Sequence, residues 1–355
     1  MGKLKLLILT QKVDINDDVL GFFHGWIAEF ARHCELITVI CLYKGEYNLP
    51  DNVKVLSLGK ETGESKIKYL INFYKYIWQE RNNYNAVFVH MNQVYVVLGG
   101  VFWRLTGKKI NLWYNHRKTS WTLKLSARLS NKIFTSTRES FTVKSKKINA
   151  VGHAIDIEKF NKNINLKSGG IFKIVYVGRI SRIKNQRLLI EAADILVNQN
   201  KLNNIKIDFI GGAIYPDDEV YLEQLQEIVN QKKLTQYVNF SGSLPFKEIE
   251  KIYSQADLSI NLCPTGGMDK TVLESMASSL PVLVLNKSFI GLLKAKENIL
   301  LLKYDDRNEL AEKIEFLKNM DVGQYRRIGE ELREKIAVNF NQKKVIETII
   351  NKITD

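Results

Sequence analysis

The sequence predicts an α/β protein made of two doubly wound domains in tandem. Short apolar runs alternate with amphipathic stretches along most of the 355 residues, a pattern typical of parallel sheets with helices on both faces. The alternation stops once, at the polar, asparagine-rich stretch 161–170, and then starts again. From Arg307 onward the pattern is almost wholly helical. We therefore expect a first domain over 1–160, a linker over 161–170, a second domain over 171–335, and a C-terminal helix over 336–355 that packs back on the first domain.

The elements of the first half follow from this pattern. The apolar runs predict strands over 4–10, 36–43, 53–58, 86–91, 110–114 and 132–135. The amphipathic stretches predict helices over 20–33, 67–79, 94–105 and 121–129, with a short helix from Arg138. In the first of these helices, one face is marked by the apolar residues Phe22, Phe23, Trp26, Ile27 and Phe30.

The second half repeats the alternation. Strands are predicted over 173–177 and 206–210 and helices over 185–198 and 219–231. The alternation continues through 238–241, 246–254, 258–262, 271–278, 282–285 and 299–302. Because ligands of α/β proteins bind at the carboxyl ends of the strands, the residues that directly follow predicted strands are the candidates for chemistry.

The composition is that of a folded protein from a reducing compartment. Hydrophobic residues make up 45% and charged residues 25% of the chain, which excludes wholesale disorder. The three cysteines, Cys34, Cys41 and Cys263, form no Cys-x-x-Cys motif, which argues against a disulfide framework or a zinc site. The N-terminus lacks a signal-peptide pattern, and no apolar run reaches the ~18 residues of a membrane-spanning helix. We expect a cytoplasmic protein, either soluble or peripheral at the inner face of the cytoplasmic membrane.

The net charge of +14 is concentrated in the first half. Residues 1–160 hold 24 Lys and Arg against 13 Asp and Glu, and the segment 104–147 holds 12 basic residues and one acid, Glu139. Four aromatic residues lie within or next to this segment: Trp103, Trp113, Tyr114 and Trp121. Such a segment can bind an anionic lipid surface, a phosphorylated substrate or nucleic acid. Equally, it can be a solvated basic face whose aromatics lie in the core. The lack of an RNA-binding motif argues against nucleic acid.

Several common active-site motifs are missing. The chain has no G-x-x-x-x-G-K-[ST], which argues against a P-loop nucleotidase, and no G-x-G-x-x-G after a strand, which argues against a nicotinamide enzyme. It also has no G-x-S-x-G and no H-E-x-x-H. The five histidines include no close pair that would make an obvious metal site.

Three stretches of the second half carry residues suited to a diphosphate. After the strand 173–177 come Gly178, Arg179 and Lys184, in a turn that opens a helix. A glycine lets a ligand approach the backbone, and the two cations and the helix N-terminus favour an anion. After 258–262 a loop with two glycines opens a helix that contains Glu274, whose carboxylate can accept bonds from ribose hydroxyls. The third stretch, after 206–210, is a Gly pair that alone indicates only a tight turn. Exposed basic residues in a strand–turn–helix and a buried structural Glu are the simpler interpretations of the first two.

In this order and spacing, the stretches resemble the retaining glycosyltransferases of family 4, which have the GT-B fold of two tandem Rossmann-like domains with a C-terminal helical tail. The match is strong over 175–285, above all where Leu273-Glu274-Ser275-Met276-Ala277 leads to Pro281-Val282. The resemblance implies that Arg179 and Lys184 hold the donor diphosphate and stabilise it as a leaving group. It implies that Glu274 binds the ribose of the nucleotide.

The donor loop departs from the family pattern at one position. The family has a first Glu that contacts the donor sugar, and this chain has Gly266 there. We expect Asp269 or the backbone amides of 267–270 to replace it, although an altered donor or impaired activity would also follow from the loss. The donor-binding residues implied by the resemblance are Gly178, Gly266, Gly267, Met268, Asp269, Lys270, Thr271, Val272 and Glu274.

The first domain offers weaker candidates for the acceptor side. The family has a loop after the first strand for the acceptor, where this chain carries Asp17 and Asp18, which can equally cap the next helix. A family histidine near the donor sugar follows a first-domain strand. His116 is in that setting, and His90, at the end of the strand 86–91, is the second choice.

The resemblance therefore implies a retaining hexosyltransferase, which we expect to be independent of metal ions. It would move a sugar from a UDP- or GDP-linked donor to a hydroxyl of a saccharide or lipid-linked acceptor, in cell-surface polysaccharide or glycolipid synthesis, with no cofactor. No Asp-x-Asp at a strand end indicates a metal-dependent site. The alternatives are a GT-B epimerase or phosphorylase, a nucleotide-sugar-binding subunit that has lost activity with the Glu at 266, and a basic adaptor for a membrane or nucleic acid.

Overall fold

The computed structural model describes residues 4–116, 118–160, 167 and 170–355, and these form two compact units. Unit 1 comprises Met1–Ala154, Pro245–Lys247 and Phe340–Asp355, and unit 2 comprises Ile155–Leu244 and Glu248–Asn339. Of the predicted linker 161–170, all but Lys167 and Gly170 lies outside the described residues. Within the described ranges, no helix has both the length and the apolar composition that a bilayer-spanning segment needs.

Unit 1 is built on a seven-stranded parallel sheet with the order β3-β2-β1-β4-β5-β6-β7. Its strands are β1 (Lys5–Val13), β2 (Leu36–Lys44), β3 (Val53–Ser57), β4 (Ala86–His90), β5 (Lys109–Trp113), β6 (Lys132–Thr135) and β7 (Ile148–Ala150). The central strand β1 pairs with β2 on one side and with β4 on the other, so that Ile8 lies opposite both Val39 and Phe88. These central strands are almost continuously apolar because helices cover both of their faces.

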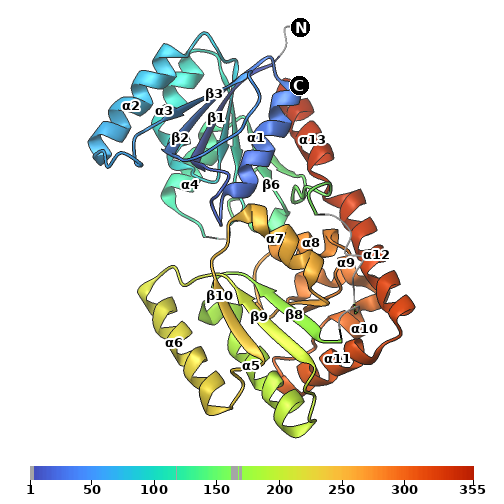
Figure 1. The fold of residues 1–355 in the computed structure, drawn as a ribbon. Helices are drawn as coiled ribbons and strands as arrows, with labels where there is room; N and C mark the ends of the chain where they lie inside the picture. The colour runs from blue at the N-terminus through green and yellow to red at the C-terminus, as the bar shows by residue number, and fades with distance from the viewer. Residues whose placement is uncertain (1–3, 117, 161–166, 168–169) are drawn as a thin grey trace. The chain divides into compact units, whose positions relative to one another are not determined.

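Alternate residues of the strands point to the two faces of this sheet. Leu6 and Ile8 join a core that α1 (Gly21–His33) and α13 (Gln342–Thr354) complete. Leu7 and Leu9 join a second core with α2 (Lys66–Gln79), α3 (Val94–Leu105) and α4 (Trp121–Leu129). In Figure 1, α1 in blue and α13 in red lie side by side, and they are in contact. The last helix of the chain is therefore part of the core of unit 1.

Unit 2 is built on a five-stranded parallel sheet with the order β10-β9-β8-β11-β12. Its strands are β8 (Phe172–Val177), β9 (Ile205–Ile210), β10 (Val238–Gly242), β11 (Leu258–Asn261) and β12 (Val282–Val284). The segment 299–302 is the end of a short helix, and only a single bridge, from Leu301 to Val284, ties it to the sheet. The two parallel sheets confirm the predicted α/β architecture.

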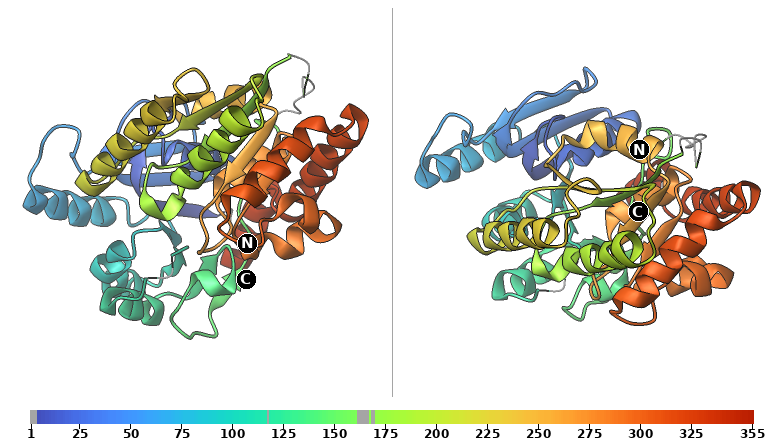
Figure 2. Two further views of the ribbon diagram at one scale, coloured as in Figure 1. Left: turned by 90° about the horizontal axis from the view of Figure 1, so that it is seen from below. Right: turned by 60° about the horizontal axis from the view of Figure 1, so that its bottom comes forward.

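The helices of unit 2 lie between and after these strands. They are α5 (Gln186–Asp194), α6 (Pro216–Gln231), α7 (Ile249–Gln255), α8 (Lys270–Ala277), α9 (Ile290–Leu293), α10 (Glu297–Leu300), α11 (Arg307–Asn319) and α12 (Val322–Asn339). α5 packs between α6 and α11, and α5 and α6 lie side by side in both views of Figure 2. α12 packs against α8 and continues past residue 336, so the helix that joins unit 1 begins at Gln342.

Candidate functional site

The carboxyl ends of β8 and β9 meet through their glycine loops. The amide of Gly178 donates to the carbonyl of Ile210 at 2.9 Å, and the amide of Ile180 donates to that of Gly212 at 3.0 Å. Gly211 has φ +142°, and a Cβ on it would lie 2.2 Å from the carbonyl oxygen of Gly178. Only glycine fits there, because the neighbouring atom belongs to the backbone and cannot turn aside. The Gly pair that the sequence indicated only as a tight turn thus fixes the loop that carries Arg179.

Replacing Gly211 by alanine is expected to lower the free energy of unfolding by about 3 kcal/mol, because it combines a strained φ with a backbone clash. Gly291→Ala is the matched control, since a Cβ there has no neighbour within 4 Å. Urea unfolding of both variants measures the difference. Equal, small effects in the two variants would contradict the close approach of the two loops.

Arg179 is held between the sheet edge and α6. Its side chain is about one third exposed, with Nε 3.8 Å from Oδ2 of Asp218 and the guanidinium 5.5 Å from the ring centre of Tyr215. Its carbonyl accepts a 2.9 Å hydrogen bond from Nε2 of Gln186, in the first turn of α5. A guanidinium so placed keeps N–H donors for a phosphate, because it has five of them in a planar fork.

Lys184 is anchored at both its backbone and its side chain. It ends the short 3-10 helix Arg182–Lys184, and Asn185 then takes a left-handed conformation with φ +56° before α5 begins. The buried hydroxyl of Tyr176, whose pKa is raised by burial, donates to the carbonyl of Lys184. The ammonium Nζ lies 2.6 Å from Oδ2 of Asp269. A second donor, Nδ2 of Asn261 at the end of β11, lies 2.9 Å from the same oxygen.

This carboxylate joins three segments that the sequence presents as separate. Asp269 is the N-cap residue of α8, yet it directs its side chain to Lys184 and Asn261 and makes no capping bond to α8. The 3-10 turn after β8, the end of β11 and the start of α8 therefore meet at one point. Arg179, Lys184 and the N-terminus of α8 all belong to this edge of the unit 2 sheet, as the sequence predicts.

The loop that is predicted to bind the donor has a glycine conformation at the position where the resemblance implies a glutamate. Gly266 has φ +112°, which an L side chain rarely adopts, although a Cβ there would meet open space. The next residue is fixed by Nδ2 of Asn286, which donates to the carbonyl of Gly267 at 3.2 Å. Since the Asp269 carboxylate is engaged by Lys184, a replacement for the missing glutamate from the backbone amides of 267–270 fits this loop better than one from Asp269.

Glu274 is buried, with 3% of its surface exposed, and it forms a charge cluster inside unit 2. Its Oε1 lies 3.3 Å from Nζ of Lys270. Burial raises the pKa of Glu274, against the opposing effects of Lys270 and Lys159. Burial also lowers the pKa of Lys270 to about 8, against the attraction of Glu274. A ribose hydroxyl that bonds to Glu274 would therefore take the place of, or add to, the Lys270 contact.

Raising the pH above 8 is expected to stabilise the protein relative to a Lys270→Met variant. Burial lowers the pKa of Lys270 from 10.5 to about 8. Between these values the unfolded chain binds more protons than the folded protein, so the free energy of unfolding rises with pH, by at most about 1.4 kcal/mol per unit. Urea unfolding of both proteins at pH 7 and at pH 9.5 measures this. A difference between parent and variant that is constant, or that moves the other way, would contradict the buried pair.

The candidates of unit 1 lie near the carboxyl edge of its own sheet. His116 is exposed in the loop after β5, and its Nδ1 accepts a 2.9 Å hydrogen bond from the amide of Lys118, which leaves Nε2 as the protonated nitrogen of the neutral ring. His90, at the end of β4, is 2% exposed. It stacks on Phe23 at 3.8 Å between ring centres, and its Nδ1 lies 3.4 Å from Oγ1 of Thr10. His116 is thus accessible, whereas His90 is packed in an aromatic core.

The two aspartates before α1 also differ in their exposure to solvent. Burial acts to raise the pKa of Asp17, but hydrogen bonds from Lys12 and from the amides of Leu20 and Val19 lower it overall. The Lys12 ammonium lies 2.5 Å from Oδ2 of Asp17. Asp17 therefore closes the turn that leads into α1, while Asp18 is exposed.

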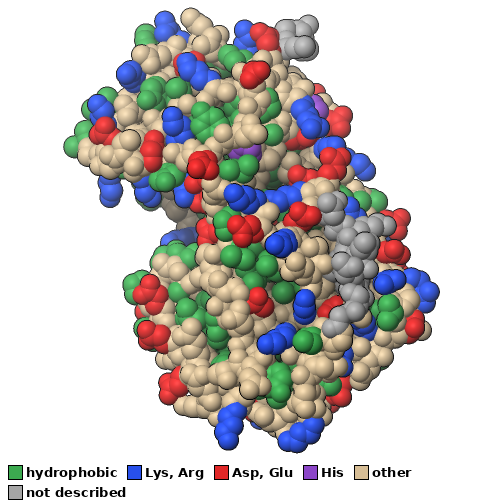
Figure 3. Space-filling model, viewed as in Figure 1, with side chains coloured by type: hydrophobic (Ala, Val, Ile, Leu, Met, Phe, Trp, Pro, Cys, Tyr) green, Lys and Arg blue, Asp and Glu red, His purple; other side chains and the backbone are tan. Residues whose placement is uncertain are grey.

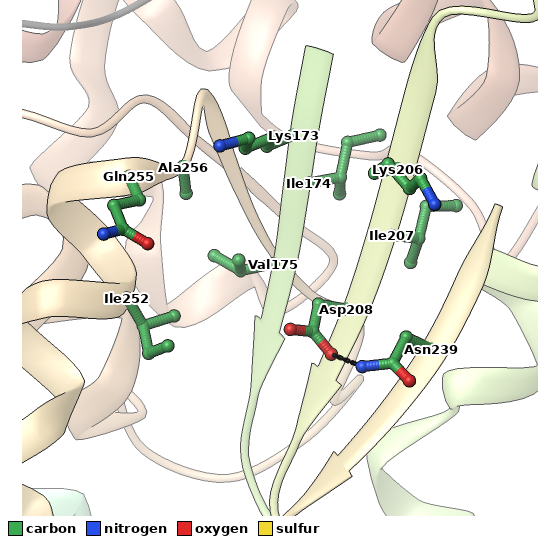
Figure 4. Close-up of a pocket in the computed structure, with 10 residues that line it drawn as sticks. All are labelled: Lys173, Ile174, Val175, Lys206, Ile207, Asp208, Asn239, Ile252, Gln255 and Ala256. Atoms are coloured by element: carbon green, nitrogen blue, oxygen red, sulfur yellow. Dashed lines mark hydrogen bonds between the residues drawn. The ribbon is translucent and has the colours of Figure 1, made fainter. Parts of the chain in front are cut away.

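A separate pocket of about 320 Å³ lies over the sheet of unit 2 (Figure 4). Its apolar floor includes Ile174, Val175 and Ile207, and Ile252 of α7 faces them. Asn239 donates to Asp208 at its rim, at 3.0 Å. The pocket lies beside residues 173–175 of β8 and 206–208 of β9, which come before the carboxyl ends of these strands. None of the ten residues that line it is a predicted donor residue. Among the residues that the structure describes, no group of three or more His, Cys, Asp or Glu is placed to hold a metal ion.

Three residues of the candidate site escape prediction from the sequence. Tyr176 lies inside an apolar strand and is indistinguishable there from a core residue. Asn286 follows β12 and contacts the donor loop only through the fold. Asn261 is the one with a signal, because it is a polar residue at the end of an otherwise apolar strand.

Comparison with known proteins finds a family model that matches the second half, relatives that match about half of the chain, and solved structures that share the whole fold. Residues 157–335 match the model of the family described as Glycosyl transferases group 1. The putative glycosyltransferase EpsD of Bacillus subtilis is 29% identical over 178 residues, which are 50% of this chain and 43% of EpsD. The putative colanic acid biosynthesis glycosyltransferase WcaL of Escherichia coli is 23% identical over 196 residues, 53% of this chain and 46% of WcaL. The matched region thus spans about half of this chain and less than half of each of these relatives.

Several solved structures resemble the whole chain, including one from Anabaena and one from Rickettsia africae. The Anabaena protein Alr3699/HepE, in complex with UDP and glucose, superposes with a TM-score of 0.77 at 14% identity and covers 99% of this chain and 100% of that one. A glycosyltransferase from Rickettsia africae superposes with a TM-score of 0.72 at 13% identity and covers 99% of each chain. This likeness confirms the predicted fold class, two tandem Rossmann-like domains of the GT-B type with a C-terminal helical tail.

Proposed function

The chain belongs to the glycosyl transferases group 1 family, and we propose that it transfers a hexose from a UDP-linked donor to a hydroxyl acceptor with retention of the anomeric configuration, as the resemblance to family 4 implies. The observation that carries the proposal is that Arg179, Lys184 and the start of α8 all lie at the carboxyl edge of the unit 2 sheet, where a 2.6 Å contact joins Lys184 to Asp269 at the start of α8. Two cations beside a helix N-terminus suit a diphosphate.

Each group has a separate task in the proposed reaction. The guanidinium of Arg179 can donate hydrogen bonds to two phosphate oxygens at once, which orients the donor. The ammonium of Lys184 has three N–H donors, so it can donate one hydrogen bond to Asp269 and another to a phosphate oxygen. As the bond between sugar and phosphate breaks, negative charge grows on the diphosphate, and these fixed cations stabilise it. Glu274 would hold the ribose through its hydroxyls.

The choice of UDP and the biological role draw on the relatives. Alr3699/HepE has been solved with UDP and with UDP and glucose, and this supports a UDP-linked donor here. WcaL is named for colanic acid biosynthesis, which supports a role in cell-surface polysaccharide synthesis with a saccharide or lipid-linked acceptor. We also propose that no metal ion is required, because Arg179 and Lys184 supply the positive charge that a metal ion can supply to a diphosphate.

The experiment is a transfer assay with UDP-glucose, UDP-galactose and UDP-N-acetylglucosamine, each with a panel of monosaccharide and lipid-linked acceptors. Release of UDP that depends on an acceptor, persists in EDTA and yields a product with the donor's anomeric configuration by NMR is the expected result. A product of inverted configuration would contradict retention. Binding of a nucleotide sugar with neither transfer nor hydrolysis would instead identify a nucleotide-sugar-binding subunit, in line with the glycine at 266.

A further inference from the structure

The helices α2 and α3 expose an apolar surface on unit 1. α3 turns Val94, Val101 and Leu105 to solvent, and Leu105 is 83% exposed. α2 adds a stripe at helical spacing that includes Ile67, Ile71 and Trp78, and Ile67 is 72% exposed. These six residues define the α2–α3 surface. Apolar side chains scattered singly over a surface are ordinary, but a contiguous group on two neighbouring helices marks an interaction site.

Contacts between the helices make the α2–α3 surface continuous. The hydroxyl of Tyr74 on α2 donates to the carbonyl of Leu98 on α3 at 3.2 Å, and the rings of Trp78 and Phe102 lie 6.0 Å apart. At the other end of α3, Nε2 of Gln93 donates to Oγ1 of Thr122 at 3.2 Å. Trp121, which directly precedes Thr122 in α4, is 72% exposed.

The charged residues of these helices are all basic. α2 carries Lys66, Lys68 and Lys75, and the sequences of α2 and α3 contain no Asp or Glu. The one cation of α3, Arg104, donates to the carbonyl of Leu129. Of the nearest acids, Glu80 is buried and its Oε1 lies 2.6 Å from Nζ of Lys54, so only Glu64 is exposed beside α2. Figure 3 shows hydrophobic, basic and some acidic side chains intermixed in its upper left, over the helix that Figure 1 labels α2.

The basic segment 104–147 behaves differently, although it has the higher density of charge in the sequence. Arg104 and Lys147 donate to the last carbonyls of α4, and Lys109 and Lys132 donate to those of α13. A cation at a helix C-terminus complements its dipole. Trp113 and Tyr114 of this segment, and Trp103 just before it, are buried. Much of its charge therefore serves the fold of unit 1.

We propose that the α2–α3 surface docks on an anionic lipid bilayer. Hydrocarbon accepts the exposed aliphatic side chains, lipid phosphates attract the lysines, and tryptophan rings suit the boundary between the two. A second copy of the chain fits this surface less well. Interfaces between proteins are depleted of lysine, and a two-fold interface would bring the same lysines face to face. This inference does not rest on the donor site.

The test is flotation of the whole protein with vesicles of phosphatidylcholine, with and without phosphatidylglycerol. The parent is expected to float with the anionic vesicles, less so at high salt. Lys68→Glu/Lys75→Glu should lower the apparent affinity at least about tenfold, and Val101→Ser/Leu105→Ser by a similar factor. The matched control is Lys144→Glu/Lys146→Glu, the same change of charge at two exposed lysines of the basic segment. It should stay within about twofold of the parent.

Three results would overturn the proposal. The first is that the parent does not float with anionic vesicles. The second is an effect of the control pair of lysines as large as that of Lys68 and Lys75. The third is conversion of a dimer to a monomer by Val101→Ser/Leu105→Ser in light scattering without lipid, which would assign the surface to a second copy. Thermal unfolding of each variant near the parent midpoint shows that it folds. UDP binding by the same variants separates a failure of this proposal from a failure of the proposed function.

Discussion

Replacing Lys184 by alanine is expected to lower the rate of sugar transfer by about 10²- to 10³-fold, the usual effect of removing one fixed group that stabilises transition-state charge. The side chains of Lys184 and Asp269 are 19% and 26% exposed, so their ion pair contributes only about 1 kcal/mol to stability. Asp269 also keeps its bond from Asn261 in the variant. The loss should therefore appear in kcat, with little change in thermal stability.

Two further variants separate the charge of Lys184 from its position. Lys206→Ala removes an exposed lysine of the same unit, on β9, and should leave the rate unchanged. Asp269→Asn keeps the ammonium but removes the carboxylate 2.6 Å away that orients it. We expect kcat to fall about tenfold through lost positioning, while UDP binding is not weakened, because a negative charge has left the diphosphate site. Initial rates of UDP release measure all three. A rate for Lys184→Ala within twofold of the parent would contradict the role of Lys184.

The double variant Ile346→Ala/Ile349→Ala is expected to unfold unit 1 or bring it close to unfolding. Both side chains are fully buried between α13 and the sheet, in the core that Phe23 and Trp26 of α1 share. Each large-to-small change in such a core costs about 2–5 kcal/mol, and a domain is stable by only about 5–15 kcal/mol. The sum is approximate because the two residues are neighbours on one helix.

Circular dichroism during thermal unfolding and limited proteolysis measure this effect. Glu347→Ala/Thr348→Ala changes two exposed residues of the same helix and should leave the midpoint within a few degrees of the parent. A double isoleucine variant that melts like this control would show that α13 contributes little to the core of unit 1. Retained UDP binding by the isoleucine variant would further show that unit 2 holds its fold when unit 1 does not.

The strands and helices of both units were predictable because each pattern has a single physical cause. Buried parallel strands are continuously apolar, as in β1 and β4, and helices that cover a sheet repeat their apolar residues with the helix period. The segment 299–302 departs from this rule because its first two residues end α10 and Leu301 then forms a single bridge with Val284 of the sheet. Short apolar runs do not distinguish a strand from a buried helix end.

The interactions within the donor loop were less accessible to the sequence. The types and order of Arg179 and Lys184 predict an anion site and Glu274 predicts a ribose contact, but their partners depend on side chains far along the chain. The pairing of Lys184 with Asp269 spans 85 positions, and the Gly211 contact depends on the exact approach of two loops. In the basic segment 104–147 the sequence suggests more than the structure supports. Its charge density predicts a binding surface, but several of its cations donate to carbonyls at the C-terminal ends of α4 and of the distant helix α13.

The measurement that tests the central claim most directly is calorimetric titration of UDP and GDP into the parent, Arg179→Ala and Lys206→Ala. Arg179 lies at the sheet edge with Nε 3.8 Å from Asp218 and has no buried core to support, so its loss should leave the fold intact. We predict that UDP binds the parent and Lys206→Ala alike, that GDP binds more weakly, and that Arg179→Ala lowers the affinity for UDP at least about tenfold. Equal binding of UDP by the parent and Arg179→Ala, or no binding of either nucleotide to the parent, would contradict a donor site at the carboxyl edge of unit 2.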